Sequence, residues 1–267
     1  MNIVVAIGAE ATPLVQALSL KKDPSCPYPL FTNGSRRLVV SGIGKERCAA
    51  ATGYLCGRFA QKNQPWLNIG IAGHGTYELG TPFLASRILD DVTGECFYPP
   101  QVLRTHIALS ELTSCCAPCS KYQAGMGYDM EAHGFCKAAC MVTTRELVQI
   151  FKIVSDNPDH PLESFDPKVA VHAIEKNLSI IERLICGLEE LSREILPDPR
   201  IGQIANRIQE KIKFSATRAV QLEDLLRQAI VLEEDLAKIE KKAALLNRAS
   251  EVLSLIEGML EGKRSLP

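Results

Sequence analysis

Apolar residues in the first two-thirds of the chain form short runs rich in valine and isoleucine, and each run ends at a turn that contains glycine or asparagine. Nearly continuous apolar strands separated by helices are typical of a mostly parallel sheet with helices on both faces. We therefore predict an α/β fold with a mostly parallel, mixed central sheet flanked by helices. In such sheets ligands bind beyond the carboxyl ends of the strands. The strand runs are 2–8 (NIVVAIG), 37–45 (RLVVSGIGK), 66–75 (WLNIGIAGHG) and 147–157 (LVQIFKIVSDN), with a helix expected at 46–61.

The pattern becomes helical from residue 166 onward. In 166–195 apolar residues recur at helical spacing, and Asp166-Pro167 is a favourable helix start. The LPDPR segment at 196–200 breaks this helix, and no glycine or proline lies between Gly202 and Gly258. We predict an α/β domain at 1–195 and an all-α extension at 196–267, a helical hairpin of two amphipathic helices. Its interspersed acids and bases indicate a solvated, structural or self-associating surface.

The segment 92–127 lacks either pattern. It contains Pro99-Pro100, a polar stretch at 113–120 and two glycines near its end. The segment is loop-rich, and the pattern does not place regular structure in it.

Charge and composition exclude several classes of protein. The 267 residues carry a formal net charge of -1, which gives no electrostatic reason to expect a nucleic acid or an anionic membrane as partner. The apolar N-terminal run lacks a basic leader and is interrupted by Glu10, so it predicts a buried strand rather than a signal peptide. Ten cysteines without an export signal indicate reduced thiols and a cytoplasmic location.

The cysteines offer one alternative chemistry. Cys115, Cys116 and Cys119 are clustered, but no second C-x-x-C pair accompanies them. Small buried apolar side chains are therefore the favoured interpretation, with metal or redox chemistry as the minor one. The glycine turns match neither a dinucleotide-binding motif nor a P-loop. We expect no metal and no cofactor.

Two acidic residues flank Met130 in the stretch GYDMEAHGF (127–135) at a predicted helix start. Acids at this position commonly cap a helix. Once the helix begins, side chains two residues apart diverge by about 200°, so Asp129 and Glu131 do not form a close acid/base pair. One is expected to contact a ligand and the other to cap the helix or face solvent.

Asp156 follows the last apolar strand and also has two interpretations. Asp-Asn-Pro is strong turn chemistry, which would make Asp156 a turn cap. Apolar surroundings also favour the protonated form of a carboxyl, which could then serve as a general acid. The histidines His74 and His133 are more typical of packing or solvent contact than of ligand binding.

Taken in order, five segments resemble the nucleoside phosphorylase superfamily, with the 5'-methylthioadenosine/S-adenosylhomocysteine nucleosidase branch as the nearest match. The resemblance covers residues 2 to about 190, and the Met-Glu-Ala and Ser-Asp elements together carry most of its specificity. The segments are IGAE (7–10), SGIGKERCAAAT (41–52), NIGIAGHG (68–75), YDMEAHGFCKAA (128–139) and KIVSDNPDHPLESFD (152–166).

The resemblance implies cleavage of the N-glycosidic bond of a purine nucleoside. It implies that Met130 lies against the sugar, that Glu131 binds the ribose hydroxyls, and that Asp156, beside Ser155, protonates N7 of the leaving base. Phe165 matches an aromatic residue that covers the 5' side of the sugar. Asn157, Ile71, Ala72 and Gly73 are the remaining expected substrate contacts. Glu131 and Asp156 should then meet at the same rim of the sheet.

The chain departs from the family in three places. Glu10 is the only acid in the register of the family's glutamate cluster, with Pro13 at the aligned position, and it is our candidate for handling the attacking water. Ile71 stands where the family commonly has a residue with a hydroxyl group. The segment before Tyr128, which in the family forms the wall around the base, is short.

An arginine-lined phosphate site is also not evident; Lys45, Arg47 and Arg87 are the nearby cations. We expect hydrolysis by an enzyme that forms a homo-oligomer, with a dimer favoured. The alternatives are a phosphate-dependent phosphorylase and a nucleoside-binding scaffold whose helical tail is the output surface.

Overall fold

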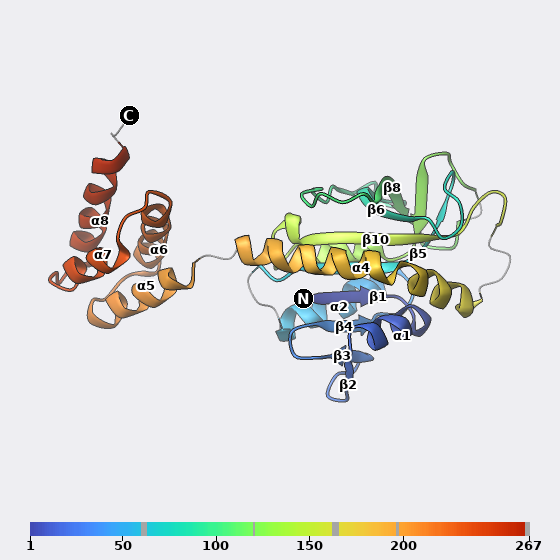
Figure 1. Ribbon diagram of the computed structural model, residues 1–267, viewed down its shortest axis with the longest axis horizontal. Coiled ribbons are helices and arrows are strands. Elements are labelled where there is room, and N and C mark those ends of the chain that lie inside the picture. Colours follow the sequence, from blue (N-terminus) through green and yellow to red (C-terminus); the bar gives the residue numbers. More distant parts are fainter. Residues whose placement is uncertain (60–62, 120, 162–165, 196–197, 265–267) are drawn as a thin grey trace. The chain divides into compact units, whose positions relative to one another are not determined.

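The computed structural model describes residues 1–59, 63–119, 121–161, 166–195 and 198–264 (Figure 1). The chain divides into two compact units, Met1–Ile195 and Leu196–Pro267. Each unit has its own buried apolar core. The units are therefore described one at a time.

The first unit is built on a ten-stranded mixed sheet, which confirms the predicted α/β fold. At its centre β4, β1, β5 and β10 run parallel to one another, while β2 and β3 extend one edge in antiparallel pairing. The central strands are buried along nearly their whole length, as their continuous apolar sequences predict. The strands are β1 (Asn2–Val5), β2 (Lys21–Asp23), β3 (Leu30–Thr32), β4 (Arg37–Val40), β5 (Trp66–His74), β6 (Pro82–Asp90), β7 (Cys96–Phe97), β8 (Ala108–Ser114), β9 (Met126–Asp129) and β10 (Val148–Asp156).

The sheet closes on itself beyond β10. β10 pairs with β6, β6 with β8, and β8 with β9, and β9 returns to pair with the end of β5. The segment 92–127, in which the sequence allowed no regular structure to be placed, contains β7, β8 and the start of β9. These strands are short and carry serine, threonine and glycine. Their stability comes from pairing with β6 and β5, which local sequence does not reveal.

Four helices cover the two faces of this sheet. α1 (Gly8–Ala17) and α4 (Pro167–Ile195) pack on one face, and α4 runs along the sheet beside β5 and β10 (Figure 1). α2 (Lys45–Phe59) and α3 (Ala132–Ala139) pack together on the opposite face. Residues such as Leu14, Leu55 and Phe135 are fully buried, and each such burial stabilises the fold by about 1.5–3 kcal/mol. A short 3₁₀ helix, η1 (Arg145–Leu147), leads into β10.

The carboxyl ends of the parallel strands meet at one rim. β1 ends at Val5 and leads directly into α1, while β4 ends at Val40 and reaches α2 through a glycine turn. The last pair in the β5–β10 register is Gly73 with Asp156. The turns that follow β1 and β4 and the last residues of β5 and β10 therefore surround a common space.

The described residues of the second unit form four helices: α5 (Pro199–Lys211), α6 (Ala216–Val231), α7 (Leu236–Ala243) and α8 (Ala249–Arg264). The predicted two-helix hairpin was therefore wrong in its number of helices. Ser215 and Asp235 cap the first turns of α6 and α7, and Glu233 adopts a positive φ of 54° after α6. These breaks use neither glycine nor proline, which is why the sequence pattern concealed them. No described helix of the chain is long and apolar enough to cross a membrane.

Candidate active site

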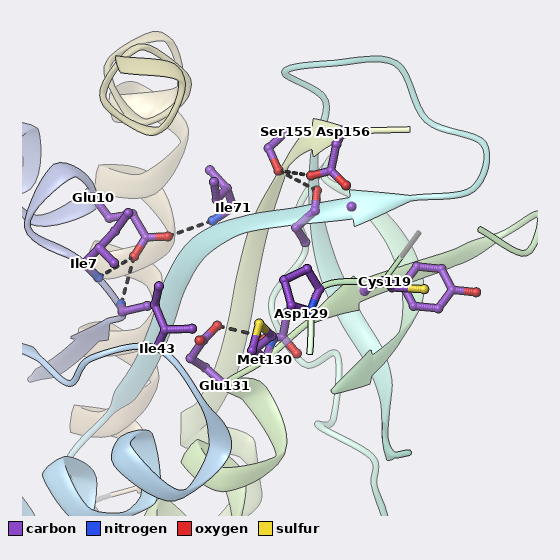
Figure 2. A pocket seen from close by; sticks show the side chains of 15 residues that line it. Ile7, Glu10, Ile43, Ile71, Cys119, Asp129, Met130, Glu131, Ser155 and Asp156 are labelled. Atoms are coloured by element: carbon purple, nitrogen blue, oxygen red, sulfur yellow. Dashed lines mark hydrogen bonds between the residues drawn. The ribbon is translucent and has the colours of Figure 1, made fainter. Parts of the chain in front are cut away.

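A cavity of about 240 Å³ lies at the rim where β1, β5 and β10 end. Glu10, Glu131 and Asp156 approach it from three directions (Figure 2). Eight of the ten residues that the sequence suggested line it: Glu10, Ile71, Ala72, Gly73, Met130, Glu131, Ser155 and Asp156. Phe165 lies outside the described residues. The remaining expected contact, Asn157, is not among the described residues that line the cavity.

Asn157 is occupied by the turn that follows β10. Its side-chain amide donates to the carbonyl of Tyr77 at 3.1 Å. Its Oδ1 accepts the backbone N–H groups of Asp159 at 3.1 Å and His160 at 2.9 Å. This is the turn chemistry that the sequence allowed for Asp156, one residue earlier. The structure thus places it on Asn157 instead.

Asp156 enters the cavity because β10 is irregular at its end. Val154 pairs with Ala72 and Asp156 pairs with Gly73, so Ser155 is an extra residue in the strand. Such a bulge re-aims side chains, and here two consecutive residues, Ser155 and Asp156, both line the cavity. The hydroxyl of Ser155 donates to Asp156 Oδ1 at 2.5 Å. The Asp156 side chain is 6% exposed.

Glu131 stands between β9 and the first residue of α3. Its Oε1 accepts the backbone N–H of Gly44 at 2.9 Å, which links the carboxylate to the glycine turn after β4. Burial raises the pKa of Glu131 to about 7; Lys152 opposes the rise and the charge of Asp129 adds to it. Near neutral pH Glu131 therefore titrates, and a bound group that donates hydrogen bonds would favour its ionised form.

Asp129 caps the helix, as one of the two flanking acids was expected to do. Its Oδ2 accepts the N–H of Ala132 at 2.8 Å, and its Oδ1 accepts the hydroxyl of Ser114 at 2.6 Å. The side chain is buried rather than facing solvent, and its Oδ2 lies 2.8 Å from Nζ of Lys152. Asp129 and Glu131 thus have different partners, as their divergence at the helix start predicts.

Lys152 is the functional candidate that the sequence analysis missed. It lies in the middle of β10 with 1% of its side chain exposed. Although burial opposes it, the carboxylates of Asp129, Glu131 and Glu10 hold the pKa of Lys152 above its ordinary value. A lone lysine within the apolar run QIFKIV was the available signal, because a buried cation needs carboxylate partners.

Gly70 makes room for Lys152 and Glu10. It pairs with Lys152 across the sheet. A Cβ on Gly70 would lie 2.8 Å from Oε1 of Glu10 and 3.3 Å from Nζ of Lys152. The carboxylate and the ammonium therefore occupy the space that a side chain at position 70 would need.

Glu10 reaches the cavity from the first turn of α1. Its Oε2 accepts the N–H groups of Ala6 at 2.8 Å and Ile7 at 3.2 Å, and its Oε1 accepts the N–H of Ile71 at 3.0 Å (Figure 2). Burial raises the pKa of Glu10, against the opposing effects of Lys152 and of these hydrogen bonds. A buried carboxyl with a raised pKa is suited to exchange a proton with a nearby group.

Both ring nitrogens of His74 have hydrogen-bond partners within the protein. Its Nδ1 accepts the N–H groups of Thr76 at 3.0 Å and Tyr77 at 2.9 Å. Nε2 must then carry the proton, and it lies 2.9 Å from the hydroxyl of Ser110. Burial lowers the pKa of His74, so the ring stays neutral, stacked on Tyr77 with its centroid 4.0 Å away. Nε2 of His133, which is also buried, lies 3.3 Å from Oε2 of Glu95.

The cations suggested as a phosphate clamp are largely neutralised. Nζ of Lys45 bonds to the carboxylates of Asp90 and Asp91. The guanidinium of Arg87 pairs with Glu111. Arg47 is exposed. None of the three is among the described residues that line the cavity.

The chain carries ten cysteines, all among the described residues. All ten thiols are free, and no group of three or more histidine, cysteine or acidic side chains among the described residues could hold a metal ion. Burial raises the pKa of Cys115 to about 12, which disfavours the reactive thiolate. Cys119 contributes to the cavity wall.

Comparisons with known proteins identify the fold. No protein-family model and no curated protein sequence matches the chain. Solved structures do match. The 5'-methylthioadenosine/S-adenosylhomocysteine nucleosidase from S. pneumoniae, solved with a transition-state inhibitor, is 18% identical, with a TM-score of 0.56 over 67% of this chain and 95% of that one. The chain contains the nucleosidase fold.

Two further structures agree. The nucleosidase from Campylobacter jejuni is 16% identical, with a TM-score of 0.56 over 72% of this chain and 98% of that one. The nucleosidase from Colwellia psychrerythraea 34H, in complex with adenine, is 20% identical, with a TM-score of 0.53 over 65% of this chain and 90% of that one. At these identities the likeness concerns the fold, and the chemistry has to be argued from the cavity itself.

Proposed function

We propose that this chain hydrolyses the N-glycosidic bond of a purine nucleoside similar to 5'-methylthioadenosine or S-adenosylhomocysteine. One observation carries the proposal: the carboxyls of Glu131 and Asp156, on different elements, line the same cavity with Glu10. Glycosidic cleavage needs separate groups for the sugar, the leaving group and the nucleophile, and three carboxyls around one cavity can fill these roles.

Glu131 is the proposed ribose anchor. The transition state for N-glycosidic cleavage carries positive charge on the sugar, which a carboxylate on the ribose hydroxyls would stabilise. The pKa of about 7 means that the free site holds this carboxyl partly protonated at neutral pH. Hydroxyl donors from the sugar would favour the ionised form. Met130, beside Glu131 in the lining, provides an apolar contact for the sugar.

Asp156 is the proposed general acid. As the bond from the sugar C1' to the base N9 breaks, its electron pair moves onto the base, and Asp156 donates a proton to N7. Its position, buried at the end of β10 beside the floor formed by Ala72 and Gly73, suits contact with a flat base. The base therefore lies at the Asp156 end of the cavity and the sugar at the Glu131 end.

Water is the proposed nucleophile. Its oxygen would bond to C1' and its proton would pass to Glu10, whose raised pKa suits it to accept one. Lys152 offsets the negative charge of the surrounding acids. The neutralised state of Lys45 and Arg87 favours water over phosphate, because a phosphate clamp needs uncompensated cations.

Base release tests the proposal. The full chain is incubated with 5'-methylthioadenosine, S-adenosylhomocysteine, adenosine and inosine, with and without inorganic phosphate. Release of free base without phosphate is the expected result, and release only with phosphate would identify a phosphorylase. If no base is released but a nucleoside still raises the melting temperature, the chain is a nucleoside-binding protein. The mass in solution tests the expected homodimer.

A further inference from the structure

Both oxygens of the Asp156 carboxyl accept a hydrogen bond from a protein hydroxyl. Ser155 donates to Oδ1, and Tyr122 donates to Oδ2, each at 2.5 Å. Each oxygen keeps a second lone pair, which can carry the proton that Asp156 is proposed to donate. Ser155 is the neighbouring residue in the chain, whereas Tyr122 comes from the segment between β8 and β9. The carboxyl is thus held from two sides.

We propose that Tyr122 is a positioning residue for the acid Asp156. The terminal torsion of an aspartate side chain has a broad energy profile, so its carboxyl plane is fixed only by what it bonds to. Proton transfer to a base nitrogen depends on that plane, because misplacement by about 1 Å costs roughly a hundredfold in rate. This inference rests on the proposed role of Asp156.

The glycines of the AGHG motif explain how Tyr122 reaches this place. A Cβ on Gly73 would lie 2.5 Å from Oδ2 of Asp156 and 2.8 Å from Cε1 of Tyr122. A Cβ on Gly75 would lie 1.8 Å from the carbonyl oxygen of Gln123. The end of β5 therefore lacks two side chains where the segment carrying Tyr122 crosses it. Neither glycine has a positive φ, so close approach is the physical reason for both.

Further contacts fasten this segment to the sheet. Gly125 donates its N–H to the hydroxyl of Thr76 at 2.8 Å. Gln123 donates its N–H to the hydroxyl of Tyr128 at 2.9 Å, and the ring of Tyr128 meets that of Tyr122 edge-on with centroids 5.8 Å apart. A phenol whose ring and following residues are fastened in this way is suited to hold a partner in place rather than to swing as a lid.

The same segment supplies the base side of the cavity. Pro118 and Cys119 line it together with Tyr128. The sequence before Tyr128 is short relative to the resembled family, and this segment takes the place of the missing wall. Tyr122 accordingly lies where the wall and the acid meet.

The test compares Tyr122→Phe with a matched control. The substitution removes one hydroxyl and keeps the ring. Tyr54→Phe is the control, because the hydroxyl of Tyr54 bonds to Arg58 on α2, outside the cavity. With 5'-methylthioadenosine, Tyr122→Phe is expected to lower kcat by about tenfold or more and to change KM by less than about threefold. Tyr54→Phe should change neither.

A second comparison tests the hydrogen bond between Tyr122 and Asp156 through the melting temperature, and it does not require catalytic activity. Tyr122→Phe should lower the melting temperature of the ligand-free protein by about 3 °C, and by less than about 1 °C in an Asp156→Ala background. In an Asp156→Asn background it should leave any residual base release unchanged.

Each outcome bears on a different claim. If the wild type releases no base, the proposed function fails while the melting comparison still decides the contact. Equal melting losses with and without Asp156 would overturn the positioning role. So would a rise in KM with kcat unchanged, or a Tyr122→Phe variant that behaves like Tyr54→Phe.

Discussion

Nζ of Lys152 lies 2.8 Å from Oδ2 of Asp129, and the two side chains are 1% and 0% exposed. The pair joins the middle of β10 to the end of β9, and Asp129 itself lines the cavity. Two ions removed from water are stable only when their attraction and their hydrogen bonds offset the lost hydration. Lys152 thus compensates Asp129 and acts on Glu131 and Glu10 as well.

Removing that ammonium should strongly destabilise the protein. Lys152→Met keeps most of the side-chain volume but leaves buried carboxylates unpaired, and we expect it to lower the free energy of unfolding by about 3–5 kcal/mol. Urea unfolding measures this. Lys137→Met is the control, because that lysine pairs with Glu95 but is 61% exposed, and its loss should be within about 1 kcal/mol. If both variants lose the same free energy of unfolding, the buried pair contributes no more to stability than the exposed one.

Asp156→Asn should separate binding from turnover. The amide keeps the shape of the carboxyl but cannot supply the acidic proton, so base release should fall by at least about a hundredfold. Stabilisation by adenine, read from the melting temperature, should remain. Asp159→Asn changes an exposed acid in the following turn and should keep full activity. A fully active Asp156→Asn variant would rule out Asp156 as the acid.

Glu131→Gln should change how stability depends on pH. Because the pKa of Glu131 rises from 4.5 to about 7 on folding, the folded protein keeps a proton in this interval that the unfolded chain has released. This group's contribution to stability is therefore lost as pH rises from about 4.5 to about 7. In Glu131→Gln the loss is absent, so the melting temperature of the variant relative to wild type should increase between pH 5 and pH 8.

Glu146→Gln is the control for this titration. Its own backbone N–H, the hydroxyl of Thr144 and the charge of Arg145 lower the pKa of Glu146, so Glu146 is ionised across the whole range from pH 5 to pH 8. The melting temperature of Glu146→Gln relative to wild type should show no trend over that range. The assignment of Glu131 fails if its variant and the Glu146 variant give the same profile.

The sequence predicted the features that depend on local pattern. Continuous apolar runs located β1, β4, β5 and β10, and the parallel arrangement followed from them. From this arrangement Asp156 was expected at one rim, and the resemblance implied that Glu131 would meet it there; both line the cavity. The resemblance supplied their roles, which stay predictions.

Features that depend on distant contacts could not be predicted. β8 and β9 exist through pairing with β6 and β5, and the bulge at Ser155 appears only in the register with β5. Lys152 is surrounded by carboxylates from two other segments, and Tyr122 bonds to a residue far along the chain. Each of these depends on packing between segments, which leaves no periodic trace in the sequence.

Gly134 in α3 is required by the close approach of α2 and α3. A Cβ there would lie 2.0 Å from the carbonyl oxygen of Lys45, a backbone atom that cannot move without shifting the start of α2. The adjacent Gly44 N–H is bonded to Glu131, so such a shift would also disturb the proposed ribose anchor. Gly134→Ala should therefore destabilise the protein by about 1–3 kcal/mol. The cost of the steric contact should therefore outweigh the roughly 1 kcal/mol by which alanine normally stabilises a helix relative to glycine.

Gly53→Ala is the matched control within α2. A Cβ at Gly53 meets no heavy atom within 4 Å, so the substitution should stabilise the protein by about 0.5–1 kcal/mol through helix propensity alone. Urea unfolding of the two variants gives opposite signs if the helix contact controls position 134. Gly134→Ala should also raise KM for the nucleoside, because the turn that bonds Glu131 moves. If Gly134→Ala is as stable as Gly53→Ala, the start of α2 can move at little cost, and it does not hold the carboxylate of Glu131 in place.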